Sequence, residues 1–125
     1  MEININCDLG EKSKFHSTEN DPHLLKIVNS ANVACGYHAG DEKTMHDTVK
    51  ISKLNQVSIG AHPSFNDPEN FGRERMNLTS EEVRKLIIDQ YEILQELLLW
   101  KLISIVIWEK NLSFILLKMI QNYLV

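Results

Sequence analysis

The sequence has no excess of basic residues, few cysteines and no long uninterrupted apolar run. Thirteen Lys and Arg are scattered among seventeen Asp and Glu, giving a net charge of −4, which argues against nucleic-acid binding. Cys7 and Cys35 are too few for a disulfide framework, and the start MEININ lacks the basic and apolar regions of a signal peptide. We therefore expect the protein to reside in the cytoplasm, where thiols stay reduced. With 43% hydrophobic and 24% charged residues, the 125 residues predict one soluble globular domain.

Glycine and proline are absent after Arg73, and the chain changes character near its end. Residues 97–125 contain 20 apolar residues in 29. A membrane span needs about 20 apolar residues with few charges, whereas Lys101, Glu109 and Lys110 divide this segment into runs that are too short. We predict a buried strand over Leu102–Trp108 and a helix over Asn111–Leu124. The alternative is that 97–125 does not belong to the fold encoded by residues 1–96.

Strand and helix signals alternate through the first 96 residues. Strands are predicted at Glu2–Asn6, Ala31–Cys35 and Val57–Ala61. Helices are predicted to begin at Asp21-Pro22, at Asp41 and at the capping box Thr79-Ser-Glu-Glu82. Helical spacing gives the first two helices the buried residues Leu24, Leu25, Ile27 and Val28, then Met45, Thr48, Val49 and Ser52. This alternation predicts an α/β protein with three β/α units in a parallel sheet.

A polar cluster follows each predicted strand: CDLGE at 7–11, GYHAGD at 36–41 and HPSFND at 62–67. Chemistry in parallel α/β folds gathers at the carboxyl ends of strands, so we expect Asp8, His38 and His62 to share one pocket. Such a group can bind a divalent metal or act as a metal-free acid–base site, and no tight ligand spacing decides between them. Asp8 and Glu11 could instead cap the turn, and Asp41 is sufficiently explained as a helix N-cap.

Other chemistry-bearing residues have simpler explanations. We take His16, His23 and His46 as solvated, and both cysteines as small core residues rather than reactive thiols. Arg73 lies in the long connection Asn66–Asn77, where its guanidinium could hold a carboxylate or phosphate. The alternative is a surface salt bridge with a neighbouring acid: Asp67, Glu69 or Glu74.

Four motifs together carry a resemblance to a known family. INCDLGE at 5–11, SANVACGYHAGD at 30–41, IGAHPSF at 59–65 and FGR at 71–73 resemble the LamB/YcsF lactam-utilisation family, over residues 3–96. Family members serve as the A subunit of the ATP-dependent 5-oxoprolinase. The resemblance implies an incomplete (β/α) barrel-like fold of the glycoside hydrolase/deacetylase type. It also implies ATP-driven cleavage of 5-oxoproline to glutamate with partner subunits B and C.

By the same resemblance, site residues can be assigned. Asp8, His38 and His62 are the expected catalytic residues, or the ligands of a divalent metal. Glu11, Asp41 and Arg73 are expected to bind substrate or phosphate. The chain has no P-loop sequence GxxxxGK[ST], so ATP is not bound by that device, and partner subunits would supply much of the nucleotide site.

The resemblance stops near Glu96, where family members continue with a Lys-Pro-His-Gly-Ala-Leu-Tyr motif and further β/α units. A closed barrel needs about 250 residues, so we interpret the apolar tail as the product of a frameshift or early stop. Two other functions therefore stay open. One is an inactive fragment, whose half barrel would expose two strand edges and an apolar inner face. The other is a metal-dependent deacetylase-like hydrolase. We expect this chain alone not to hydrolyse 5-oxoproline.

Overall fold

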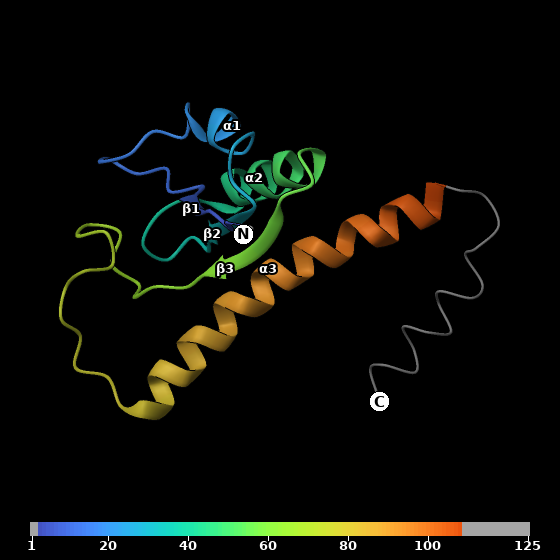
Figure 1. The fold of residues 1–125 in the computed structure, drawn as a ribbon. Coiled ribbons are helices and arrows are strands. Elements are labelled where there is room, and N and C mark those ends of the chain that lie inside the picture. The colour runs from blue at the N-terminus through green and yellow to red at the C-terminus, as the bar shows by residue number, and fades with distance from the viewer. Residues whose placement is uncertain (1–2, 109–125) are drawn as a thin grey trace.

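The computed structural model describes residues 3–108, with side chains up to residue 99. Its elements are β1 (Asn6–Leu9), α1 (Asp21–Leu24), β2 (Ser30–Ala34), α2 (Glu42–Leu54), β3 (Ser58–His62) and α3 (Ser80–Trp108) (Figure 1). The three strands are parallel and lie in the order β1-β2-β3. The predicted parallel α/β architecture is therefore confirmed.

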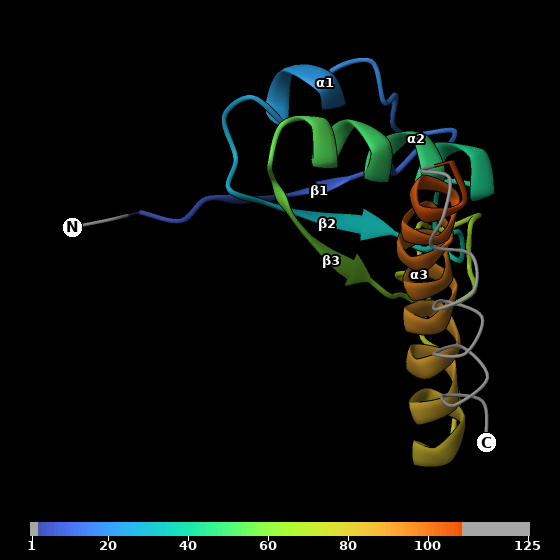
Figure 2. The same cartoon turned by 90° about the vertical axis from the view of Figure 1, so that its right-hand side faces the viewer.

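The hydrophobic core lies between one face of the sheet and the helices. Both views show α1 and α2 over the same face, while α3 packs against α2 and β3 and extends past the sheet (Figures 1 and 2). The predicted inner face of α2 is buried as expected, through Met45, Thr48, Val49 and Ser52. The buried apolar cluster comprises Leu9, Leu25, Val28, Ala31, Val33, Cys35, Met45, Val49, Val57 and Leu94.

The other face of the sheet is polar. Side chains alternate along a strand, so the residues between the buried ones share this face. Two rows of paired residues cross it, Asn6–Ser30–Ser58 and Asp8–Asn32–Gly60. The expectation of an apolar inner face was wrong, because the apolar positions of all three strands point toward the helices.

The first strand begins later than the sequence pattern indicated. We predicted Glu2–Asn6, whereas β1 spans Asn6–Leu9. The alternation of apolar residues continues past Ile5, and pairing with β2 selects the register that buries Leu9, which is 1% exposed. Ile3 and Ile5 stay exposed, at 69% and 47%. As a result Asp8 belongs to the strand itself rather than to the loop after it.

The first helix is shorter than expected and has a different cap. Asn20 is the N-cap, not Asp21, and it makes no side-chain capping hydrogen bond. The Asp21 carboxylate instead accepts a 2.8 Å hydrogen bond from the Gly10 backbone N–H, which ties α1 to the loop after β1. Ile27, predicted to be buried, is 67% exposed because α1 ends at Leu24.

The other two helix starts are confirmed. The Asp41 carboxylate accepts from the Thr44 backbone N–H at 2.7 Å and caps α2. At the start of α3, the Thr79 N–H donates to Glu82 Oε2 at 2.7 Å, and the Glu82 N–H donates back to Thr79 Oγ1 at 3.3 Å. This reciprocal pair is the predicted capping box.

The predicted strand over Leu102–Trp108 was wrong, because α3 continues without a break to Trp108. No glycine or proline interrupts it, and a helix satisfies its backbone hydrogen bonds locally, so it needs no neighbouring strand. The helix predicted over Asn111–Leu124 lies outside the described residues. Within residues 3–108, no helix combines the length and apolar character that crossing a membrane requires.

Candidate acid–base site

A cavity of about 280 Å³ opens where the three strands end. Its walls come from the connections that follow β1, β2 and β3, together with Asp8 in β1 and His62 in β3. The lining residues are Asp8, Glu11, His16, His38, His62, Ser64, Phe71, Gly72 and Arg73. The structure thus brings together Asp8, His38 and His62 in one cavity, as their equivalent positions after successive strands predicted.

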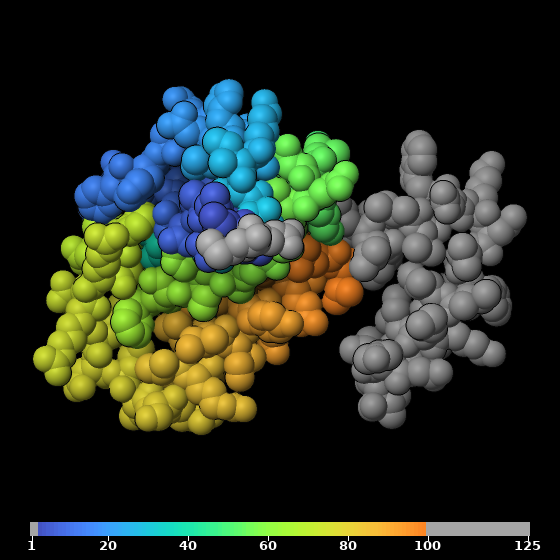
Figure 3. Space-filling model, viewed as in Figure 1, coloured from blue at the N-terminus to red at the C-terminus, as the bar shows by residue number. Residues whose placement is uncertain are grey.

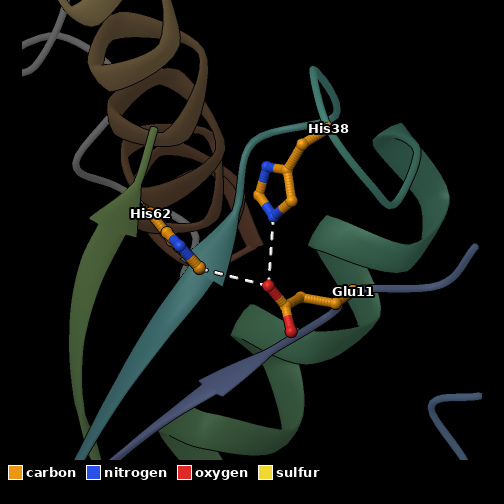
Figure 4. Close-up of side chains that lie close together, drawn as sticks. All are labelled: Glu11, His38 and His62. Carbon is orange, nitrogen blue, oxygen red and sulfur yellow. Dashed lines mark hydrogen bonds and ion pairs between the residues drawn. The ribbon is translucent and has the colours of Figure 1, made fainter. Parts of the chain in front are cut away.

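Glu11 is the centre of the cluster. Its Oε1 lies 3.1 Å from His38 Nε2 and 3.5 Å from His62 Nδ1 (Figure 4). The two imidazole rings are 4.8 Å apart between centroids, at an angle of 55°. We expected Glu11 to bind substrate or phosphate, but its carboxylate is turned toward the two histidines. A carboxylate in this position orients imidazoles and stabilises positive charge on them.

His38 is buried, with 2% of its side chain exposed, and has one nitrogen to spare. Its Nε2 is paired with Glu11, whereas its Nδ1 has no hydrogen-bond partner among the described residues. A buried polar atom without a partner costs free energy, which makes this nitrogen a candidate contact for a ligand or metal. His38 does not belong to the apolar cluster between the sheet and the helices, so its burial serves the cavity rather than the hydrophobic core.

His62 and Asp8 border the cavity from the polar face of the sheet. His62 Nδ1 lies 3.7 Å from Asp8 Oδ1, a distance that permits charge interaction but not a good hydrogen bond. Asp8 Oδ1 accepts instead from Asn32 Nδ2 at 2.9 Å. Sequence reasoning missed Asn32, although the parallel register that pairs it with Asp8 contains the necessary information.

An aromatic group covers His38 from the side of the long connection before α3. The edge of the Phe71 ring meets the His38 ring at 5.1 Å and 85°, and the His16 ring stacks on Phe71 at 4.6 Å. His16, which we took as simply solvated, is exposed but lines the cavity. Figure 3 shows the blue segment after β1 and the yellow-green segment before α3 in contact, where Lys14 pairs with Glu69 at 2.6 Å.

Arg73 faces this same cavity. Its Cζ lies 5.5 Å from the centre of the Phe71 ring, and within residues 3–108 it forms no ion pair. Two of the acids suggested as its partners are otherwise engaged: the Asp67 carboxylate accepts from the backbone of Asn70 and Glu74, and Glu69 binds Lys14. The third, Glu74, forms no ion pair with Arg73 among the described side chains. The guanidinium is therefore available to a ligand in the cavity.

Asp41 does not join this cluster. Its carboxylate is occupied in capping α2, and these hydrogen bonds from Thr44 lower its pKa. The thiols are likewise unsuited to chemistry. Burial raises the pKa of Cys35 and is also the largest cause of the raised pKa of Cys7, where Asp8 adds to it. Both thiolates are disfavoured, which supports the interpretation of the cysteines as packing residues.

Glu11, His38 and His62 also have the donor set of a metal site. One ligand atom from each lies within 4.8 Å of the others. We expected Asp8 as the carboxylate ligand, and the geometry places Glu11 closer to both histidines. The arrangement can therefore transfer protons or hold a divalent cation, and both belong to hydrolytic chemistry at the strand ends of a parallel sheet.

Fold and site together define a parallel α/β protein with an acid–base cluster at its strand ends. Comparison with known proteins gives the family: the LamB/YcsF sequence profile matches residues 3–106, and the chain belongs to that family. The match extends beyond residue 96, the limit of the resemblance that we had identified from the motifs.

Curated relatives and a solved structure share this sequence and fold over part of their length. It is 49% identical over 90 residues to the A subunit of 5-oxoprolinase from Staphylococcus epidermidis and 48% identical over 88 residues to that from Clostridium kluyveri. These alignments cover 72% and 70% of this chain but only 36% and 34% of the relatives, so the chain spans about a third of their length. A crystal structure of the lactam utilization protein from Thermus thermophilus superposes with a TM-score of 0.75 at 35% identity. The superposition covers 81% of this chain and 41% of that one.

Proposed function

We propose that this chain carries the strand-end acid–base residues of the A component of a 5-oxoprolinase, which opens the lactam of 5-oxoproline to glutamate in an ATP-dependent reaction. The observation that supports this is the Glu11 carboxylate, which lies between His38 and His62 in the cavity at the ends of the strands, 3.1 Å from one ring nitrogen and 3.5 Å from the other. The names of the relatives point to the same activity.

The chemistry requires groups of this kind. A lactam is an amide, so its cleavage needs an activated carbonyl, a water nucleophile and a proton for the leaving nitrogen. In our proposal ATP phosphorylates the lactam oxygen and leaves as ADP, and Asp8 or His62 activates a water that adds to the carbonyl carbon. The C–N bond then breaks as the nitrogen takes a proton, and a second water hydrolyses the resulting acyl phosphate to glutamate and phosphate. His38 stabilises charge on oxygen or protonates nitrogen through its free Nδ1. Arg73 holds the carboxylate or the phosphate.

Partner subunits B and C belong to this proposal, as does a cytoplasmic location where ATP is available. The chain provides three strand ends, whereas a barrel site draws on residues around the whole rim. We therefore expect the purified chain, added to subunits B and C with ATP and 5-oxoproline, to release no more glutamate than B and C alone. Turnover above this background that is lost in His38→Ala would make the chain a working subunit by itself.

A chimera tests the site residues directly. Residues 3–96 of this chain replace the corresponding segment of the Staphylococcus epidermidis relative, which is assayed with B and C for glutamate release. We expect an active chimera, and a loss of about 10²–10⁴-fold in kcat on His38→Ala. The matched control is His23→Ala, an exposed histidine in α1. A folded chimera that retains its activity with His38→Ala would contradict the proposed role.

The cluster also favours a second candidate, a metal-dependent hydrolase. In this case Glu11, His38 and His62 would hold a divalent cation that polarises a carbonyl and lowers the pKa of bound water. Calorimetric titration of the purified chain with Zn²⁺ tests it. We expect Glu11→Gln to weaken binding more than Asp8→Asn, because Glu11 lies closer to both histidines. Absence of binding to the wild-type chain would remove this candidate.

A further inference from the structure

Gln90 of α3 forms an unusually complete set of hydrogen bonds with the backbone next to the site. The side chain is fully buried. Its Oε1 accepts from the Ser64 N–H at 2.9 Å, and its Nε2 donates to the Ser64 carbonyl at 2.8 Å. A second donation from Nε2, to the Leu86 carbonyl at 3.0 Å, holds the amide group in place on the helix.

The backbone needs such a partner at this point. The pairing of β3 with β2 ends at His62, which lies opposite Ala34. Pro63 has no N–H, so Ser64 is the first residue after His62 whose backbone N–H can donate a hydrogen bond. The Gln90 amide presents one donor and one acceptor to Ser64, as a neighbouring strand would, and thereby holds the backbone two residues beyond the last paired residue of β3.

The side chain of Ser64 also packs closely against Gly72. A Cβ on Gly72 would collide with Ser64 Oγ and lie 2.9 Å from His38 Cβ, so only glycine fits between these two residues. Ser64 and Gly72 both line the cavity that contains His38 and His62. The path of the chain after His62 is therefore constrained at the Ser64 backbone by Gln90 and at the Ser64 side chain by Gly72.

We propose that Gln90 is a positioning residue, which directs the His62 ring toward Glu11 by fixing the backbone of Ser64. Gln90 does not line the cavity, so it acts through Ser64. The proposal deepens the proposed function, since a shift of about 1 Å in a reacting group can reduce a rate about 100-fold. The orientation of the His62 ring can be measured without the reaction, so failure of the proposed function and failure of the positioning role are distinguishable.

The test uses nuclear Overhauser effects between the ring protons of His38 and His62 in the full chain, whose ring centroids are 4.8 Å apart. Gln90→Met preserves the volume but removes the hydrogen bonds to Ser64. Because the effect falls with the sixth power of distance, a shift of about 1 Å lowers its intensity about threefold. Gln95→Met, an exposed position on the same helix, is the matched control and should leave the intensity unchanged.

A second variant, Gln90→Glu, keeps the proposal testable if Gln90→Met does not fold. Gln90→Glu retains an acceptor for the Ser64 N–H but loses the donor to its carbonyl, so we expect a smaller fall in the same signal. If either folded variant loses stability while the His38–His62 signal keeps its wild-type intensity, Gln90 is only a structural anchor and the proposal is wrong. Loss of glutamate release in the chimera bears on the proposed function and leaves this result unaffected.

Discussion

Replacing Gly72 by alanine probes the close packing between the connection after β3 and His38. Gly72 has φ +70°, and its added Cβ would collide with Ser64 Oγ and lie 2.9 Å from His38 Cβ and 3.2 Å from Ser64 Cβ. The serine hydroxyl can rotate away, but the two Cβ atoms are fixed by the backbone. Ordinary contacts of this kind are 3.4–4 Å, so the connection must move away from His38.

Gly36→Ala is the matched control, because it separates strain from collision. Gly36 has φ +83° and no atom within 4 Å of its added Cβ. An alanine in this conformation costs about 1–2 kcal/mol, of which the lower freedom of the unfolded chain offsets part. We expect a net loss of about 1 kcal/mol for Gly36→Ala. Overpacking adds about 1–3 kcal/mol, which gives about 2–4 kcal/mol for Gly72→Ala.

Urea denaturation followed by circular dichroism measures both free energies of unfolding. The difference between the two variants is the contribution of the contact with Ser64 and His38. If Gly72→Ala is no more destabilised than Gly36→Ala, the connection does not pack against His38 as described. The arrangement of the cavity would then need revision.

Three further outcomes follow from local contacts. Thr79→Ala removes the capping box of α3 and should lower the free energy of unfolding by about 1 kcal/mol in urea, whereas Ser80→Ala should not. Hydrogen bonds from Thr44 lower the pKa of Asp41 below its ordinary 3.8, so its contribution to stability is present above that pH. It disappears as the pH falls through the folded-state pKa, and Asp41→Asn should show a weaker acid dependence in thermal melts. An aromatic disulfide reagent should label Cys35 only after unfolding, because the thiol is 2% exposed and burial raises its pKa; rapid labelling of the native protein would disagree.

Local signals in the sequence were sufficient for two of the three helix starts and for the order of the elements through residue 96. Asp41 and the pair Thr79 and Glu82 cap their helices as predicted, because capping depends on residues three positions apart. Asp21 behaved differently, since its carboxylate is used by the distant Gly10 N–H. A contact between residues eleven positions apart leaves no periodic pattern that could be recognised.

The limits of strands depend on pairing, and this is why β1 was misplaced. Alternation continues from Ile3 to Leu9, and only the register with β2 selects Asn6–Leu9.

Part of the site was predictable, because the carboxyl ends of parallel strands converge and this brings Asp8, His38 and His62 together. The central position of Glu11 was not predictable, because it depends on how close its carboxylate lies to His38 and His62, which come from the ends of two other strands. Helical spacing placed Gln90 in the pattern of the long helix, but the sequence does not distinguish a glutamine that binds a distant backbone from any other polar residue of a helix.

The residues that stabilise the fold and the residues that line the cavity lie on opposite faces of the sheet. The apolar residues that stabilise the domain lie between the sheet and the helices, while Asn6, Asp8, Asn32 and His62 project from the opposite side. Substitutions on the polar side therefore leave the hydrophobic core intact. The lining of the cavity and the stability of the domain can therefore change independently, since a substitution at Asp8 or His62 alters the lining while the apolar contacts between the sheet and the helices stay in place.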